Sequence, residues 1–88
     1  MAVAQWLVEH RVAITGADTW SFGAVPGEDP ERPFLVPQTL NVRHGLFIME
    51  NLATEVLARA EVSEFLFVLT HHKTRGSTAA VIAPAAVT

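Results

Sequence analysis

The 88-residue sequence contains no cysteine, which excludes disulfide bonds and thiolate metal sites. It is also poor in charge, since 17% of its residues are charged, against about 25% in an average soluble domain. Nine acidic residues and six Lys or Arg give a net charge of -3. The bases are scattered singly, so the sequence lacks the basic stripe that is typical of nucleic-acid-binding proteins.

Long apolar runs are missing too. No stretch approaches the roughly 20 apolar residues of a membrane-spanning helix. The N-terminal segment has no basic residues before its apolar part, and Gln5 and Glu9 interrupt it, unlike a signal peptide. We therefore expect a cytoplasmic protein that contacts neither membrane nor nucleic acid.

Several catalytic motifs are absent. There is no G-x-G-x-x-G for a dinucleotide, no G-x-S-x-G nucleophile elbow and no H-x-x-x-H or H-x-H pair for a metal. His10 and His44 fall at predicted helix ends, and His71 and His72 are adjacent, so on a strand they would point to opposite faces. The sequence alone does not predict a complete metal site.

Apolar residues, in contrast, make up 50% of the chain. A domain of this length buries only about 60–65% of the surface of its unfolded chain. We therefore expect residues 1–88 to form one domain, incomplete by itself, which forms a homo-oligomer or is a piece of something larger.

Hydrophobic periodicity predicts an α/β domain with two or three helices and one small mixed sheet. In the first helix, Val3, Trp6, Leu7 and His10 would share a face. Residues 16–36 read as a long loop. The expected helices are 3–10, 37–44 and 52–61, and the expected strands are 12–15, 46–49, 65–69 and 79–83.

Four finer predictions concern individual positions. Gly45 should follow the end of the second helix, and Asn51 should cap the third. The run Phe65–Leu69 lacks polar alternation, which predicts a central strand buried on both faces. A hairpin around Lys73–Gly76 would join it to the last strand, which Pro84 should end.

Two acids follow short apolar strands. Glu50 comes where a strand leads toward a helix, and Asp18 follows the first strand. Parallel strands would place both at the same edge of the sheet, where α/β folds bind ligands. The simpler alternatives are that Glu50 interacts with a helix dipole and that Asp18 accepts hydrogen bonds in its own turn. Trp20 and Phe22, beside the long loop, are candidates for the wall of an aromatic substrate pocket.

Several segments, in order, resemble the C-terminal part of the cyclase-family metal-dependent hydrolases, which include the bacterial kynurenine formamidases. The block Ala4–Ser21 is similar to their helix, strand and G-x-D-T/S segment, and Gly45–Leu52 resembles their G-x-x-I-x-E-N-L segment. The pieces Glu64–Leu69, Gly76–Thr78 and Ala83–Val87 resemble their last strands.

The resemblance implies a compact α/β fold with a barrel-like centre and hydrolysis of an amide or ester with zinc or manganese. It places a metal ligand at Glu50. The family's H-x-G-T-H-x-D motif is absent, and Gln38 or Thr39 lies where relatives carry a histidine for acid–base chemistry. The resemblance therefore implies a C-terminal fragment that is inactive alone and whose partner is the missing N-terminal part. The alternatives are a non-catalytic association domain derived from that family and an unrelated small α/β domain.

Overall fold

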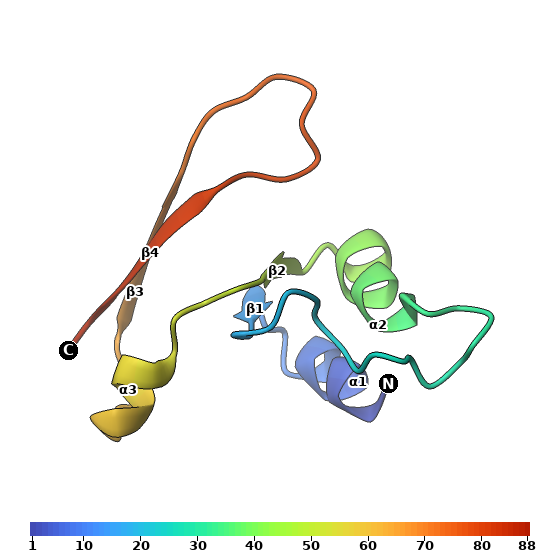
Figure 1. Ribbon diagram of the computed structural model, residues 1–88, viewed down its shortest axis with the longest axis horizontal. Coiled ribbons are helices and arrows are strands. Elements are labelled where there is room, and N and C mark those ends of the chain that lie inside the picture. The colour runs from blue at the N-terminus through green and yellow to red at the C-terminus, as the bar shows by residue number, and fades with distance from the viewer. The chain divides into compact units, whose positions relative to one another are not determined.

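The computed structural model describes residues 1–88 and divides into two compact units, Met1–Thr54 and Glu55–Thr88 (Figure 1). The chain is a small mixed α/β protein with three α-helices, one π-helical segment and two sheets of two strands each. The α/β class is therefore as predicted. The prediction of a single mixed sheet is wrong, because the four strands form two separate pairs and no hydrogen bonds join one pair to the other.

The first unit begins with helix α1, Ala2–Glu9. Its buried residues are Ala4 and Leu7, whereas Trp6 is 54% exposed. The predicted apolar face of this helix is therefore correct for Leu7 and wrong for Val3, Trp6 and His10, which are exposed. The core lies along positions three apart from Met1 through Ala4 to Leu7, and Trp6 stacks on the ring of His10 instead, with 4.0 Å between the ring centroids.

Two three-residue strands, β1 (Ile14–Gly16) and β2 (Phe47–Met49), form a parallel pair in which Gly16 lies opposite Met49. Parallel neighbours require a crossover connection. Here it contains the long loop, the short helix α2 (Leu35–Pro37) and the π-helix η1 (Gln38–Arg43), which follow one another without a break. The second predicted helix thus exists but begins two residues earlier, and Pro37 lies in its first turn, where no backbone donor is needed.

Leu40, in η1, is completely buried. Gly45 follows the end of this helix at φ +64°, as predicted, and the backbone N–H groups of Gly45 and Leu46 donate to the carbonyls of Asn41 and Leu40. The reversal brings Leu46 into the core. The core of the unit consists of buried and half-buried apolar side chains from α1, the loop, α2, η1 and β2: Met1, Ala4, Leu7, Val8, Val12, Phe22, Val36, Leu40, Leu46 and Ile48.

The third helix is shorter than predicted. Helix α3 covers Glu55–Arg59, and Asn51 lies before it in the left-handed region at φ +55° rather than as its cap. Leu52 does not start the helix because its side chain packs beside Gly16. A Cβ on Gly16 would lie 2.6 Å from Leu52 Cδ1 and 2.9 Å from Met49 Cβ.

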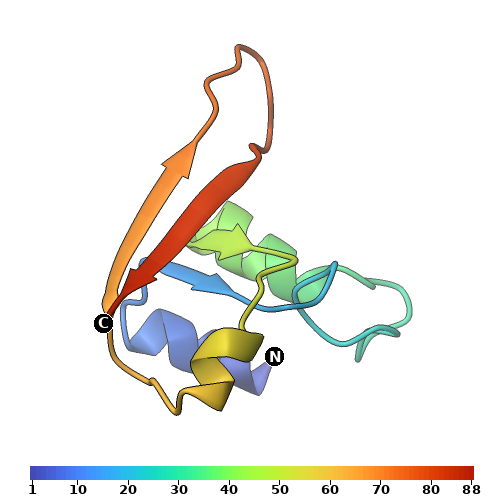
Figure 2. The ribbon, with the colours of Figure 1, turned by 60° about the vertical axis from the view of Figure 1, so that its left-hand side comes forward.

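The second unit carries the antiparallel hairpin of β3 (Leu66–His71) and β4 (Ile82–Val87), shown in Figures 1 and 2. The predicted hairpin is confirmed. The predicted central strand is wrong for the single chain, because β3 has one neighbour and Leu66 is 65% exposed. Pro84 does not end the last strand but pairs with Leu69 inside it. A proline is tolerated there because β4 is an edge strand.

A large part of the chain's surface stays open. The accessible area is 7155 Å². Scaling with mass gives roughly 5,100 Å² for a compact protein of this size, and roughly 6,100 Å² if the two units are counted as separate compact bodies. The observed area is larger than both values.

None of the helices has the length and apolar character that crossing a membrane requires.

Candidate functional site

Glu50 and Asp18 lie at the same end of the parallel β1–β2 pair. Glu50 immediately follows β2, and Asp18 comes two residues after β1. Since the strands run in the same direction, their carboxyl ends share one edge of the sheet. The predicted placement of these two acids at one edge is therefore present in the structure.

Backbone hydrogen bonds continue this pairing beyond the strands. The N–H of Ala17 donates to the Met49 carbonyl at 3.2 Å, and the N–H of Leu52 donates to the Ala17 carbonyl at 3.0 Å. A further bond joins the N–H of Asn51 to the Thr19 carbonyl at 2.9 Å. The two acidic positions thus lie within adjacent, mutually bonded segments, and the backbone around both is fixed.

Neither carboxylate is occupied by another group. Glu50 and Asp18 are exposed, and neither side chain takes part in a hydrogen bond or an ion pair. The two simpler readings therefore have no support in side-chain contacts, because Asp18 accepts no bond in its turn and Glu50 precedes α3 by five residues. The oxygen atoms of both carboxylates are therefore free to bind a cation or a polar group.

The residues of this chain do not by themselves fit a complete metal centre. No group of three or more His, Asp or Glu side chains comes together. A hydrolytic zinc site needs about three protein ligands and an open position for water. Glu50 and Asp18 supply at most two carboxylates, so any metal centre at this edge would need ligands from elsewhere.

The histidines lie apart from this edge. The Nδ1 atom of His10 lies 2.8 Å from the Trp6 carbonyl, and His44 is exposed at the end of η1. The Nδ1 atom of His71 lies 2.8 Å from the His72 carbonyl, while Nδ1 of His72 accepts from the Val81 N–H at 3.0 Å. The bond to Val81 joins the two strands of the hairpin next to its tip, so the contacts of His72 are structural.

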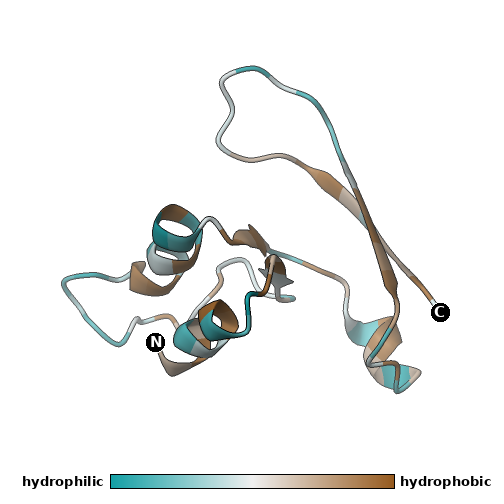
Figure 3. Ribbon diagram, turned by 180° about the vertical axis from the view of Figure 1, so that it is seen from behind, coloured by the Kyte–Doolittle hydropathy of each residue, from teal (hydrophilic) through white to brown (hydrophobic).

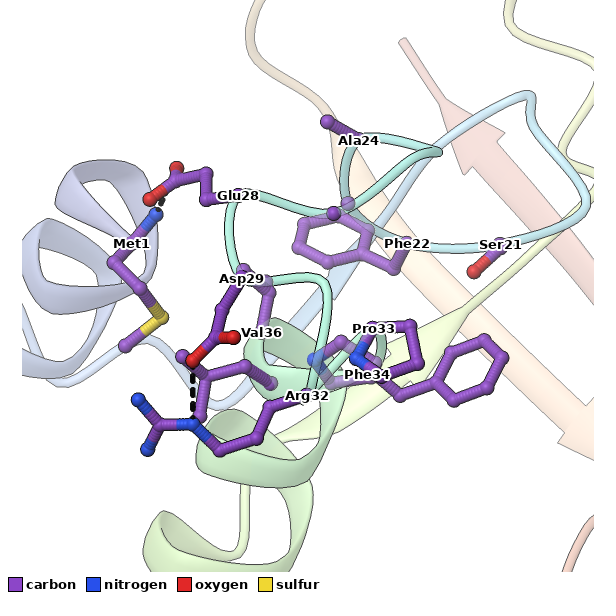
Figure 4. Close-up of a pocket in the computed structure, with 14 residues that line it drawn as sticks. Met1, Ser21, Phe22, Ala24, Glu28, Asp29, Arg32, Pro33, Phe34 and Val36 are labelled. Carbon is purple, nitrogen blue, oxygen red and sulfur yellow. Dashed lines mark hydrogen bonds and ion pairs between the residues drawn. The ribbon is translucent and has the colours of Figure 1, made fainter.

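A small pocket of about 30 Å³ lies between the long loop and helix α2 (Figure 4). That volume holds one or two water molecules. It is too small for an aromatic amide substrate. Its lining is mostly apolar and includes Phe22, Pro33, Phe34 and Val36.

Two ion pairs lie at the rim of this pocket (Figure 4). The α-amino group of Met1 lies 2.7 Å from Glu28 Oε1, and Arg32 Nε donates to Asp29 Oδ2 at 2.7 Å. The bond from Arg32, followed by the bond from the Glu31 backbone N–H, lowers the pKa of the Asp29 carboxyl below its ordinary value. The pair fixes the turn that carries the loop back toward α2.

The predicted substrate-pocket residues do not come together. Phe22 lines the pocket and packs on the core, whereas Asp18 is outside the lining and Trp20, also outside it, is 66% exposed. Gln38 and Thr39, which only the sequence resemblance places where the family carries a histidine, lie in η1. Gln38 is exposed and Thr39 half-buried.

Sequence reasoning missed the Asp29–Arg32 pair. A signal was present, because an Asp three residues before an Arg in a proline-rich turn can accept both backbone and guanidinium bonds. The prediction treated this stretch only as a loop. Its ordered turn shows that the loop has structure of its own.

Comparison with protein-family models, with curated proteins and with solved structures gave no match to this chain. The cyclase-family resemblance therefore stays an expectation from the sequence segments.

Proposed function

We propose that this chain is the C-terminal part of a cyclase-family metal-dependent hydrolase that acts on an amide or ester, in the manner of an arylformamidase, and that it hydrolyses nothing alone. The observation that carries the proposal is the pair of free carboxylates, Glu50 and Asp18, at one fixed edge of the β1–β2 pair. Such an edge is where α/β folds bind ligands.

In this proposal Glu50 is one ligand of a zinc or manganese ion. The remaining ligands come from a separate segment that carries H-x-G-T-H-x-D. Asp18 orients a bound water or substrate from the neighbouring segment. When bound, the metal would supply an acidified water and stabilise negative charge on the substrate oxygen. Without the second segment both contributions are missing. Gln38 and Thr39 belong to this chain and transfer no proton in either state, so turnover in the assembled protein requires a proton-transferring group from elsewhere.

A complementation experiment tests this function. The purified chain is mixed with a second polypeptide that carries the H-x-G-T-H-x-D segment, and Mn²⁺ binding is followed by electron paramagnetic resonance. Hydrolysis of N-formylkynurenine is measured in the same mixtures. We expect binding and turnover only in the mixture, with a loss of at least about tenfold in metal affinity for Glu50→Gln, which removes a ligand charge.

A matched control is Glu9→Gln, which changes an exposed acid on α1, away from the β1–β2 edge. It should leave metal binding unchanged. Metal-dependent turnover by the chain alone would contradict the proposed fragment. Unchanged metal binding after Glu50→Gln in an active mixture would contradict the role of Glu50.

A second candidate function is a non-catalytic association domain. It is favoured by the open apolar surface of the β3–β4 hairpin, where Leu66 and Val87 are more than half exposed. The two candidates differ in one measurement. An association domain binds its partner equally well with Glu50→Gln and without metal, whereas the proposed hydrolase fragment gains a metal site on assembly.

A further inference from the structure

The β3–β4 hairpin has one face that is apolar and open. Opposite residues of an antiparallel pair share a face, so the register places Leu66, Val68 and Thr70 on the same side as Val87, Ala85 and Ala83. Leu66 is 65% exposed, Val68 43% and Val87 53%. The alternation continues to Val81, which is 77% exposed and bonds to the backbone of His72. These residues are called the Leu66 face.

The other face is better covered. Phe67, Leu69, Ile82 and Ala86 are half-buried there, and the Phe65 and Phe67 rings lie 6.4 Å apart. Phe65, which is 37% exposed, and the exposed residues Pro84 and His71 also belong to this face. Figure 3 shows the apolar character of both strands and the polar tip between them. The most exposed large apolar side chains of the hairpin, Leu66, Val81 and Val87, thus lie on the Leu66 face, where only Thr70 and, at the tip end, His72 are polar.

The two ends of the hairpin carry opposite charges. Lys73 and Arg75 lie in the tip, and Glu61 and Glu64 lie just before β3. All four side chains are exposed, and none of them forms an ion pair. Eight residues, 65–72, lie between Glu64 and Lys73, and the nine steps along an extended chain span roughly 30 Å. This distance exceeds the screening length of about 8 Å at physiological salt, so the two ends of one hairpin do not neutralise each other.

A second copy of the hairpin, turned end for end, matches this pattern. We infer that two copies of this chain associate through their Leu66 faces, as a two-fold symmetric dimer with the hairpins antiparallel. Each tip, with Lys73 and Arg75, then lies beside Glu61 and Glu64 of the partner copy. A symmetric interface of this kind is self-complementary, because the same patch serves both partners.

The available area indicates a weak, reversible dimer. A half-exposed Val or Leu presents on the order of 100 Å². With the alanines and the charged ends, the Leu66 face offers on the order of 500 Å² per copy. Specific but weak complexes bury less than about 1,200 Å² in total. This inference does not depend on the proposed role of Glu50, which lies in the other unit.

Analytical ultracentrifugation of the intact chain tests the dimer. The average mass should rise with concentration from 9.6 kDa toward twice that value. Leu66→Thr keeps a strand-forming residue, and we expect it to weaken association about tenfold or more. The matched control Val42→Thr changes a side chain that is 78% exposed in the other unit and should have no effect. Nuclear magnetic resonance of the β3–β4 amide protons verifies that the variant hairpin is formed.

Charge exchange tests the antiparallel orientation. The double variant Lys73→Glu/Arg75→Glu should dimerise about tenfold or more weakly, and so should Glu61→Lys/Glu64→Lys, because each places like charges together. A mixture of the two should form a heterodimer as tight as the parent dimer or tighter. Homodimers unaffected by either change would overturn the antiparallel arrangement. A chain that stays monomeric at all concentrations, or that grows into open-ended oligomers, would overturn the dimer itself.

Discussion

Arg11 and Glu61 occupy equivalent positions in the two units, each just past the end of a helix and each at φ +52°. After α1, the N–H of Arg11 donates to the Val8 carbonyl and the N–H of Val12 donates to that of Leu7. After α3, Glu61 and Val62 make the same pair of bonds to Ala58 and Leu57. Both helices thus end in a Schellman motif, with a charged residue where glycine is preferred.

Replacing Arg11 with glycine should therefore stabilise the chain. A side chain in the left-handed region costs about 1–2 kcal/mol, and glycine avoids this cost but loses more backbone entropy on folding. We expect Arg11→Gly to raise the free energy of unfolding by about 0.5–1 kcal/mol. Urea denaturation should show a higher midpoint at unchanged slope. Arg11→Ala, which keeps the left-handed strain, is the control, and an equal gain from it would contradict this account.

Gly16→Ala should destabilise the first unit. A Cβ at this position would lie 2.6 Å from Leu52 Cδ1 and 2.9 Å from Met49 Cβ, so both neighbours must shift. We expect a loss of about 1–3 kcal/mol in the free energy of unfolding. If the clash is the cause, the effects of Gly16→Ala and Leu52→Ala should be less than additive in the double variant. Thermal denaturation followed by circular dichroism measures all three variants.

Leu40→Ala removes the one large side chain that is fully buried. A cavity of this kind costs about 2–5 kcal/mol, whereas a chain of this length has a total stability of about 4–13 kcal/mol. The first unit should therefore be largely destabilised, which amide hydrogen exchange can measure separately from the hairpin. Val42→Ala, two residues further along and 78% exposed, should change stability by less than about 0.5 kcal/mol.

The Asp29–Arg32 pair should make the loop sensitive to acid. Hydrogen bonds from Arg32 and the Glu31 N–H lower the pKa of Asp29 below its ordinary value of 3.8. A carboxyl whose pKa is lowered by folding stabilises the folded state above its unfolded pKa. That contribution is lost as the pH falls through the folded pKa. A carbon-13 titration of the Asp29 carboxyl should give a midpoint below 3.8.

Two variants separate the causes of that shift. Arg32→Gln should raise the Asp29 midpoint toward its ordinary value, because the largest cause is removed. Glu31→Gln should leave it nearly unchanged, since only the backbone N–H of residue 31 donates to Asp29. A midpoint that ignores Arg32→Gln would show that the guanidinium is not the cause.

Local chemistry could be predicted from the sequence at several particular positions. Gly45 ends a helix because the chain needs positive φ there, and the polar segment after His71 forms the tip of a hairpin. Asp18 and Glu50 could be placed together because two short apolar strands, joined by a long connection, favour parallel pairing. These features depend on residues close in sequence, whose conformational preferences act before any packing.

Other features were decided by packing between distant residues. The contact of Leu52 with Gly16 and Met49 delays α3 to Glu55, although the apolar spacing of residues 52–60 suits a longer helix. The buried face of α1 is the one that packs against apolar side chains of α2, η1 and Leu46. Trp6 does not lie on that face and stays outside the core. Local sequence patterns do not predict such contacts, because each contact depends on the shape of a surface formed by residues elsewhere in the chain.

The α/β class, the hairpin and the acidic edge of the β1–β2 pair could all be predicted from patterns in the amino-acid sequence. The division of the strands into two separate pairs, with a single neighbour for β3, follows from tertiary packing and could not be predicted from local patterns. The apolar run of β3 favours burial of both faces of the strand. The hydrophobic effect is non-directional, so the run does not specify which surface buries them. That choice depends on the surface that the rest of the chain, or a second copy of it, brings to the Leu66 face.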